Sequence, residues 1–109
     1  MRKGFVVTVN NQIVLECANA RSPARLRRYF EEMDADMDKG IQLSEEWVEK
    51  PELYQKQLYV SMLLIRCIDA QETNQVKLLQ NFIADRYSEL SEIRVTQHDE
   101  DFSLQLINN

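Results

Sequence analysis

Glycine, proline and histidine are scarce in this chain, and several familiar functional motifs are missing with them. The 109 residues include two glycines, two prolines and one histidine. With so few turn-forming residues, long irregular loops are not expected and regular elements should dominate. The sequence has no glycine-rich phosphate loop, no G-x-S-x-G turn, no H-E-x-x-H motif and no dinucleotide fingerprint. It therefore favours a non-catalytic protein over an enzyme.

Cysteines and long hydrophobic runs are also few. Cys17 and Cys67 lie far apart in apolar stretches, which favours two buried thiols in a reducing cytoplasm. The longest apolar stretch, residues 58–68, is too short to cross a bilayer and is interrupted by Ser61 and Arg66. The first residues lead into a short alternating run, so we expect no secretory signal. The sequence thus predicts a cytoplasmic protein without a membrane partner, and its general character suggests a small bacterial protein.

The charge balance is acidic, with a net charge of -5 and a pI of about 4.9. Such a chain is repelled by phosphate backbones and by anionic membrane surfaces, so no nucleic-acid partner is expected. One local basic cluster consists of Arg21, Arg25, Arg27 and Arg28. This cluster is either a site for a carboxylate or phosphate, or a solvated helix face paired with Glu31 and Glu32 at helical spacing.

Two hairpins are predicted, one at each end of the chain. Phe5, Val7 and Val9 alternate with other residues, and a second β-rich run covers residues 12–16. Asn10 and Asn11 separate the two runs and tolerate the positive φ that a tight primed turn requires. Near the C-terminus, alternating runs at residues 93–96 and 102–106 flank a polar turn at residues 98–101, which predicts the second hairpin.

Three helices are predicted between the hairpins. The first begins at Ser22 and Pro23, stops near Lys39 and Gly40, and has one apolar stripe: Leu26, Tyr29, Phe30, Met33 and Met37. The second opens at Pro51, runs to about Ala70 and carries more apolar residues than one stripe needs, so we expect contacts on two of its sides. The third lies within residues 76–90, after a turn at residues 71–73. A short helical turn is expected at Glu45, Glu46 and Trp47.

The predicted fold class is therefore α+β, in a single domain over residues 1–109. The expected element order is β-β-α-α-α-β-β. Two hairpins joined into a four-stranded antiparallel sheet, with the helices packed on one face, would bury the apolar residues. The polar alternation in the strands agrees with one solvated face of the sheet.

One acidic segment stands out at residues 34–45. Acidic residues occupy its positions one, three, five and twelve, and an isoleucine occupies position eight. This spacing resembles the calcium loop of the EF-hand family, in which a tightly wound loop aims six to eight oxygens at one ion. The resemblance implies carboxylate ligands from Asp34, Asp36 and Asp38, a carbonyl from Gly40, a water-mediated contact from Gln42 and a bidentate Glu45, with calcium or magnesium as the ion.

The segment also departs from that pattern and has a second interpretation. The glycine expected at position six comes one residue late, and Lys39 stands in its place. In the second interpretation, the aspartates lie in the last turn of a helix and face water or a protein partner. Carboxylates there oppose the helix dipole by about 0.3–1 kcal/mol each, so three of them need a compensating cation.

Other candidate chemistry is sparse. His98 is the only histidine, and it would need both distant cysteines beside it to form a zinc site. A Cys-His nucleophile pair would need one of them beside it. A magnesium-dependent hydrolase would need facing carboxylates on two helices, for which Glu31, Glu32 and Asp34 have only two possible counterparts, Asp69 and Glu72. We therefore expect an interaction or adaptor domain without a cofactor, with Asp34, Asp36, Asp38 and Trp47 at its contact surface. The partner would be another protein or a second copy, in a homo-oligomer, and calcium binding is the alternative.

Overall fold

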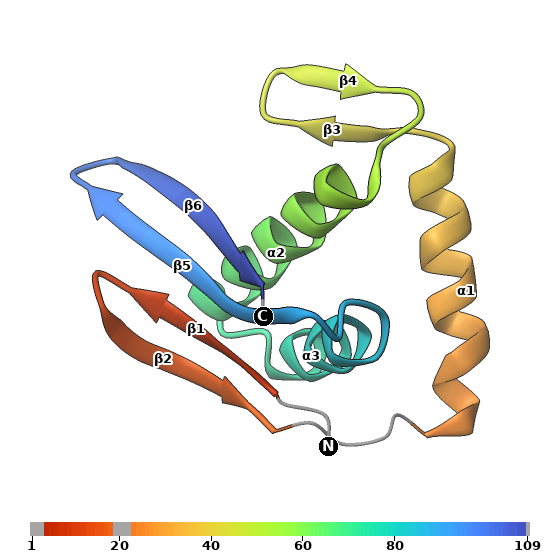
Figure 1. The fold of residues 1–109 in the computed structure, drawn as a ribbon, viewed down its shortest axis with the longest axis horizontal. Helices are drawn as coiled ribbons and strands as arrows, with labels where there is room; N and C mark the ends of the chain where they lie inside the picture. Colours follow the sequence, from red (N-terminus) through yellow and green to blue (C-terminus); the bar gives the residue numbers. More distant parts are fainter. Residues whose placement is uncertain (1–3, 19–22, 109) are drawn as a thin grey trace. The chain divides into compact units, whose positions relative to one another are not determined.

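The computed structural model describes residues 4–18 and 23–108 of the chain (Figure 1). The chain forms two compact units. Unit 1 comprises residues 1–21 and 83–109, and unit 2 comprises residues 22–82. The prediction of a single domain stays a prediction. Three helices and six strands are present in the described part, so the α+β class is confirmed.

Unit 1 contains a four-stranded sheet in the order β2(Gln12–Cys17), β1(Phe5–Val9), β5(Leu90–His98) and β6(Asp101–Asn108). The β1–β2 and β5–β6 pairs are antiparallel hairpins, as the sequence predicts, but β1 and β5 are parallel. The prediction of an all-antiparallel sheet was therefore wrong. The turn residues in the sequence determine only how the two strands of one hairpin pair with each other. The long helical connection between the hairpins allows β1 and β5 to lie parallel.

The turns of unit 1 use the residues that the sequence indicated. Asn10 and Asn11 have φ angles of 50° and 70°, the pair of positive values that a type I′ turn needs. The Asn10 side chain also accepts a hydrogen bond from the Gln97 backbone N–H at 2.9 Å, which connects this turn to β5. Asp99 at the β5–β6 turn has a φ of 53°. Both predicted hairpins are confirmed.

Unit 2 contains α1(Ala24–Asp38), β3(Ile41–Leu43), β4(Glu46–Val48), α2(Leu53–Asp69) and α3(Thr73–Arg86), whose last residues belong to unit 1. The expected short helix at Glu45 to Trp47 is wrong, because β3 and β4 form a separate antiparallel hairpin there. Figure 1 shows this hairpin following the C-terminal end of α1 and leading into α2. Its two-residue turn starts at Ser44, whose φ is 56°. The predicted element order therefore lacked two short strands.

The helix ends of unit 2 agree with the sequence signals to within a few residues. The proposed cap Ser22 lies outside the described residues, and Pro23 is the residue that precedes α1. At the start of α2, the Gln55 side chain accepts a hydrogen bond from the Glu52 backbone N–H at 2.8 Å. After α2, the chain turns at Gln71, whose φ is 59°. These caps satisfy backbone groups that a helix end leaves without partners.

Each unit has its own set of buried side chains. In unit 1 the fully or nearly fully buried apolar residues include Phe5, Val7, Leu90, Ile93 and Val95. In unit 2 they include Phe30, Val60, Leu64 and Phe82. The prediction that all helices pack on one face of the sheet involves both units and stays a prediction.

No helix in the described ranges has the length and apolar character needed to cross a membrane. Cys17 and Cys67 are half-buried, so the expectation of two buried thiols is corrected. Cys17 lies on the edge strand β2, and only part of its side chain is covered. The cytoplasmic location stays a prediction.

Candidate functional site

The negative charge of the chain is concentrated in unit 2. Residues 31–52, named here the acidic segment, contain nine acidic residues and two lysines, a net charge of -7. The whole chain has a net charge of -5, so the remaining residues are slightly basic. The segment covers the C-terminal half of α1, the β3–β4 hairpin and the residues before α2. A dense negative field of this kind attracts positively charged groups.

The structure distributes the predicted ligand residues over α1, β3 and the residues that follow each of them. Asp34, Asp36 and Asp38 lie within α1, while Gln42 is on β3 and Glu45 is in the following turn. On a helix, residues four apart share a face and residues two apart do not. Asp36 therefore points away from the face that Asp34 and Asp38 share. The Gln42 amide donates a hydrogen bond to the Ser44 carbonyl at 3.1 Å, within the hairpin.

No metal-binding constellation is present among the described residues. Over residues 4–18 and 23–108, no three or more His, Cys, Asp or Glu side chains are grouped so that they could hold an ion. The sole histidine, His98, is exposed at the end of β5. Asp69 and Glu72 lie exposed at and after the C-terminal end of α2. Calcium or magnesium binding by residues 34–45 stays a prediction of the sequence.

Lysines supply much of the compensation that the aspartates at the end of α1 need. Lys56 of α2 forms an ion pair and hydrogen bond with Asp38, and the Lys56 side chain is only 18% exposed. Lys39 lies 3.7 Å from Asp36, but both side chains are more than three-quarters exposed. Exposed pairs contribute little, whereas a mostly buried cation depends on its partner. The Lys56–Asp38 pair thus fastens α2 to the end of α1.

Asp38→Asn and Asp36→Asn should therefore have different effects. The first leaves Lys56 without its carboxylate and should lower the free energy of unfolding by about 1–2 kcal/mol. The second removes an exposed charge that opposes the helix dipole and should change it by less than about 0.5 kcal/mol. Urea unfolding of both variants at pH 7 measures the difference. Equal effects would show that Lys56 does not depend on Asp38.

A pocket of about 200 Å³ opens between α1 and α2, within unit 2. We name it the α1–α2 pocket. Its wall consists of Met33, Asp36 and Met37 of α1, Gly40 and Ile41 after that helix, and Tyr59, Val60 and Leu63 of α2. Most of these side chains are apolar, and Asp36 is the one carboxylate among them. Five of these eight residues belong to the acidic segment, so an apolar recess lies beside its carboxylates.

Trp47 lies against this region. A Cβ atom added at Gly40 would come within 2.3 Å of the Trp47 ring, so the indole packs directly on the glycine backbone. Trp47 is nevertheless 57% exposed, and Leu53 and Tyr54 at the start of α2 are 62% and 55% exposed. Three large apolar side chains within a stretch of eight residues are thus exposed to solvent. Protein-binding surfaces commonly contain exposed apolar side chains of this kind.

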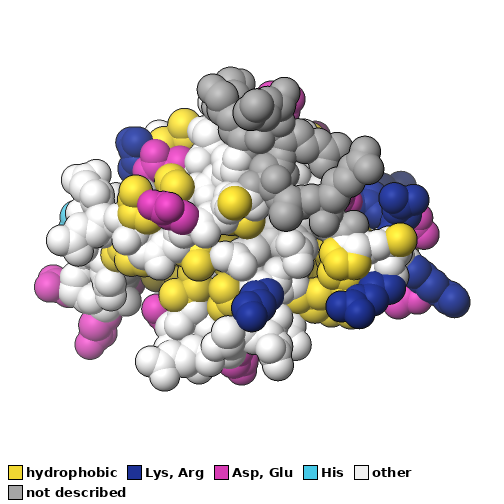
Figure 2. Space-filling view, turned by 90° about the horizontal axis from the view of Figure 1, so that it is seen from below, with side chains coloured by type: hydrophobic (Ala, Val, Ile, Leu, Met, Phe, Trp, Pro, Cys, Tyr) yellow, Lys and Arg dark blue, Asp and Glu magenta, His cyan; other side chains and the backbone are white. Residues whose placement is uncertain are grey.

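The opposite end of α1 is basic. Arg25, Arg27 and Arg28 are exposed in the first two turns of the helix, and Arg21 lies outside the described residues. In Figure 2, dark-blue basic side chains gather on the side where α1 lies. Arg28 is 3.6 Å from Glu32 in an i,i+4 pair and is 90% exposed. This pair agrees with the solvated-face interpretation. Basic side chains at the N-terminal end of α1 and acidic side chains at its C-terminal end both oppose the helix dipole.

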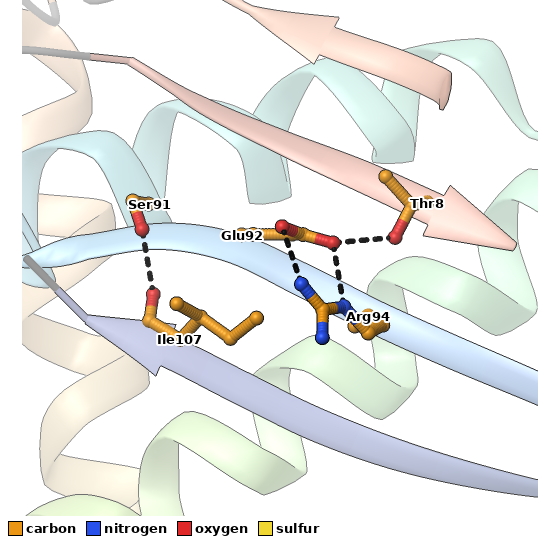
Figure 3. A network of polar contacts seen from close by, with 5 residues as sticks. All are labelled: Thr8, Ser91, Glu92, Arg94 and Ile107. Atoms are coloured by element: carbon orange, nitrogen blue, oxygen red, sulfur yellow. Dashed lines mark hydrogen bonds and ion pairs between the residues drawn. The ribbon is translucent and has the colours of Figure 1, made fainter. Parts of the chain in front are cut away.

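A polar network on the sheet of unit 1 was not predicted from the sequence. The Glu92 carboxylate of β5 accepts hydrogen bonds from Thr8 Oγ1 at 2.7 Å and from Arg94 Nε at 3.0 Å and Nη2 at 3.3 Å (Figure 3). Hydrogen bonds from Arg94 and then from Thr8 lower the pKa of Glu92 below its ordinary value of 4.5. Because Thr8 is on β1, the network connects the two parallel strands.

The network predicts a pH-dependent part of the stability. A carboxylate whose pKa is lowered in the folded state stabilises that state above its unfolded pKa, and this stability is lost as the pH falls through the folded pKa. Glu92→Gln should lower the free energy of unfolding by about 1 kcal/mol at pH 7, and its difference from the wild type should shrink below about pH 4.5. Urea unfolding between pH 3 and 7 measures this difference. Glu89→Gln, at an exposed carboxylate of unit 1, is the control and should change the free energy of unfolding by less than about 0.5 kcal/mol at pH 7.

Neither cysteine has the character of a nucleophile. Burial raises the pKa of the Cys17 thiol. Burial, a hydrogen bond with Glu72 and the charge of Glu72 raise the pKa of Cys67. A reactive cysteine needs a lowered pKa, so both thiols stay protonated near neutral pH.

Comparisons with protein-family models, curated proteins and solved structures find no match for this chain. The resemblance of residues 34–45 to the EF-hand loop thus rests on the spacing of the acidic residues alone.

Proposed function

We propose that this chain is a non-catalytic protein-interaction domain whose acidic segment binds a positively charged segment of another protein. The observation that carries the proposal is Trp47, an indole 57% exposed within a stretch of net charge -7. Tryptophan is among the residues most enriched at the energetic centres of protein interfaces. Surrounding acidic residues would steer and orient a basic partner.

The position of the acidic residues also supports this function. They lie on two short strands and on helix ends held together by the Lys56–Asp38 pair, so the surface has a defined shape before binding. A preorganised surface costs less entropy on binding than a disordered acidic tail.

The raised cysteine pKa values also give no support to a thiol-based enzyme.

Photo-crosslinking from a defined position tests the proposal. A photoreactive phenylalanine analogue at position 47 should give a discrete covalent adduct in cells that express the protein, because that position would face the partner. The same analogue at Lys77, an exposed residue of α3, is the control and should give none. Mass spectrometry identifies the adduct.

The adduct also distinguishes two partner classes. A covalent complex with a different protein, through a peptide rich in lysine or arginine, supports the proposal. A complex with a second copy of this chain would instead mean self-association, in which the arginines of α1 are the available basic segment. Equal labelling from positions 47 and 77 would contradict the assignment of the surface.

A further inference from the structure

We infer that the α1–α2 pocket receives one large apolar side chain from the basic partner segment, while Asp36 at its wall binds an adjacent lysine or arginine of the same segment. This inference rests on the proposed function and specifies the chemistry of the partner. It joins two features of unit 2, an apolar recess and a negative field, that occupy the same place in the fold.

The size of the pocket favours a side chain over a small molecule. Ligand pockets commonly measure about 300–1,000 Å³, and this one measures about 200 Å³. A leucine, methionine or phenylalanine side chain is a better match to such a space than a metabolite. Helical and extended peptides bind in this way, with one or a few side chains inserted as anchors.

The wall chemistry favours an apolar anchor. Met33 and Leu63 contribute half-buried apolar side chains, and Met37, Ile41 and Val60 form the buried part of the wall. Methionine adapts its shape to different partners because its thioether chain is unbranched and polarisable. The recess therefore suits a side chain of general apolar character.

Asp36 favours a cation beside that anchor. Its carboxylate is exposed, and its ion pair with Lys39 is 3.7 Å long between side chains that are 77% and 80% exposed. Such a pair contributes little stability and exchanges readily for another cation. Lysine or arginine next to the apolar anchor would thus complete the contact, and the net charge of -7 over residues 31–52 would attract further basic residues.

A random library of 12-residue peptides displayed on phage tests the inference. The library is selected against the wild-type protein and, in parallel, against two variants whose fold is checked by circular dichroism. Leu63→Trp fills the pocket from a half-buried position, and Asp36→Lys reverses the charge at its wall. Lys77→Glu changes an exposed residue outside the pocket and serves as a matched control.

The expected result is a set of peptides that share net positive charge and one large apolar residue. Their affinity, measured by isothermal titration calorimetry, should fall about tenfold to a hundredfold with Leu63→Trp. Asp36→Lys should weaken binding about tenfold, 500 mM salt should weaken it further, and Lys77→Glu should not. If Leu63→Trp does not fold, replacing the apolar anchor of the peptide with serine should cause the same loss.

Three outcomes would overturn the inference: no enriched peptides, enriched peptides without positive charge, or peptides that bind the pocket-filled variant equally well. The crosslinking experiment tests the proposed function separately. The photoreactive residue is placed at position 47 in two chains, one otherwise wild type and one that also carries Leu63→Trp. Equal adduct yields from the two chains would support a protein-binding surface and reject the pocket as its anchor site, whereas no adduct from either chain would reject the proposed function itself.

Discussion

Gly40→Ala should lower the free energy of unfolding by about 2–3 kcal/mol and displace the Trp47 ring. Gly40 has a φ of 131°, a region that residues with a side chain occupy at a cost of about 1–3 kcal/mol. The added Cβ would also lie 2.3 Å and 2.7 Å from the Cζ2 and Cε2 atoms of Trp47. Backbone strain and ring displacement therefore act together at the start of β3. Urea unfolding and the emission maximum of the single tryptophan report the two effects separately.

A double-mutant cycle separates the two contributions. In the Trp47→Ala background the clash is absent, so Gly40→Ala should cost only the strain of its backbone conformation. The coupling between the two substitutions then measures how closely the indole packs on Gly40. A cycle with no coupling and an unchanged emission maximum for Gly40→Ala would show that Trp47 does not rest on this glycine.

Phe30→Ala should lower the free energy of unfolding by about 3–5 kcal/mol, more than Gly40→Ala does. The Phe30 side chain is fully buried, and its ring meets Phe82 edge to face with centroids 5.4 Å apart. Removing it leaves a cavity and deletes an aromatic pair that adds to the apolar burial. Because whole domains are stable by about 5–15 kcal/mol, this loss brings the protein close to unfolding. Urea unfolding at 25 °C measures it.

Tyr29→Ala is the matched control for Phe30→Ala. Tyr29 is the preceding residue of the same helix and is 43% exposed, so truncating it should cost less than about 1.5 kcal/mol. Circular dichroism shows whether both variants keep their helix content. Comparable losses at the two positions would mean that the buried side of α1 is not the one described.

The local signals in the sequence predicted most elements, because those signals act over a few residues. The two asparagines at positions 10 and 11 adopt the expected positive φ angles, and the helix boundaries fall near Pro23, Gly40 and Gln71. The parallel β1–β5 pairing was missed because it joins residues about 86 positions apart, such as Val6 and Glu92. No turn motif encodes a contact of that range.

The β3–β4 hairpin was missed for a different reason. Its strands are three residues each, too short for an alternating pattern, and the turn uses Ser44 at a positive φ where glycine or asparagine is usual. A glutamate-rich stretch with a serine before it is also typical of a helix start, which explains the incorrect expectation. Residues 34–45, which have the calcium-loop spacing, therefore extend over a helix end, a strand and a turn.

The candidate site was predicted only in part. The sequence indicated the acidic residues and their conflict with the helix dipole, but not the Lys56–Asp38 pair, which joins two helices. The α1–α2 pocket also depends on residues from both helices, such as Met33 and Leu63. One signal for the sheet network was available: Glu92 and Arg94 have opposite charges two residues apart, and so share a face of a strand.

The most direct test of the central claim is the crosslinking yield from position 47 after charge reversal. One variant replaces the exposed Glu45, Glu46 and Glu49 of the acidic segment with lysine, and its control replaces the exposed Asp69, Glu89 and Glu100 in the same way. Both change the net charge equally. An interaction surface at the acidic segment predicts that the partner adduct disappears in the first variant and persists in the control. Equal yields from the two variants would contradict it.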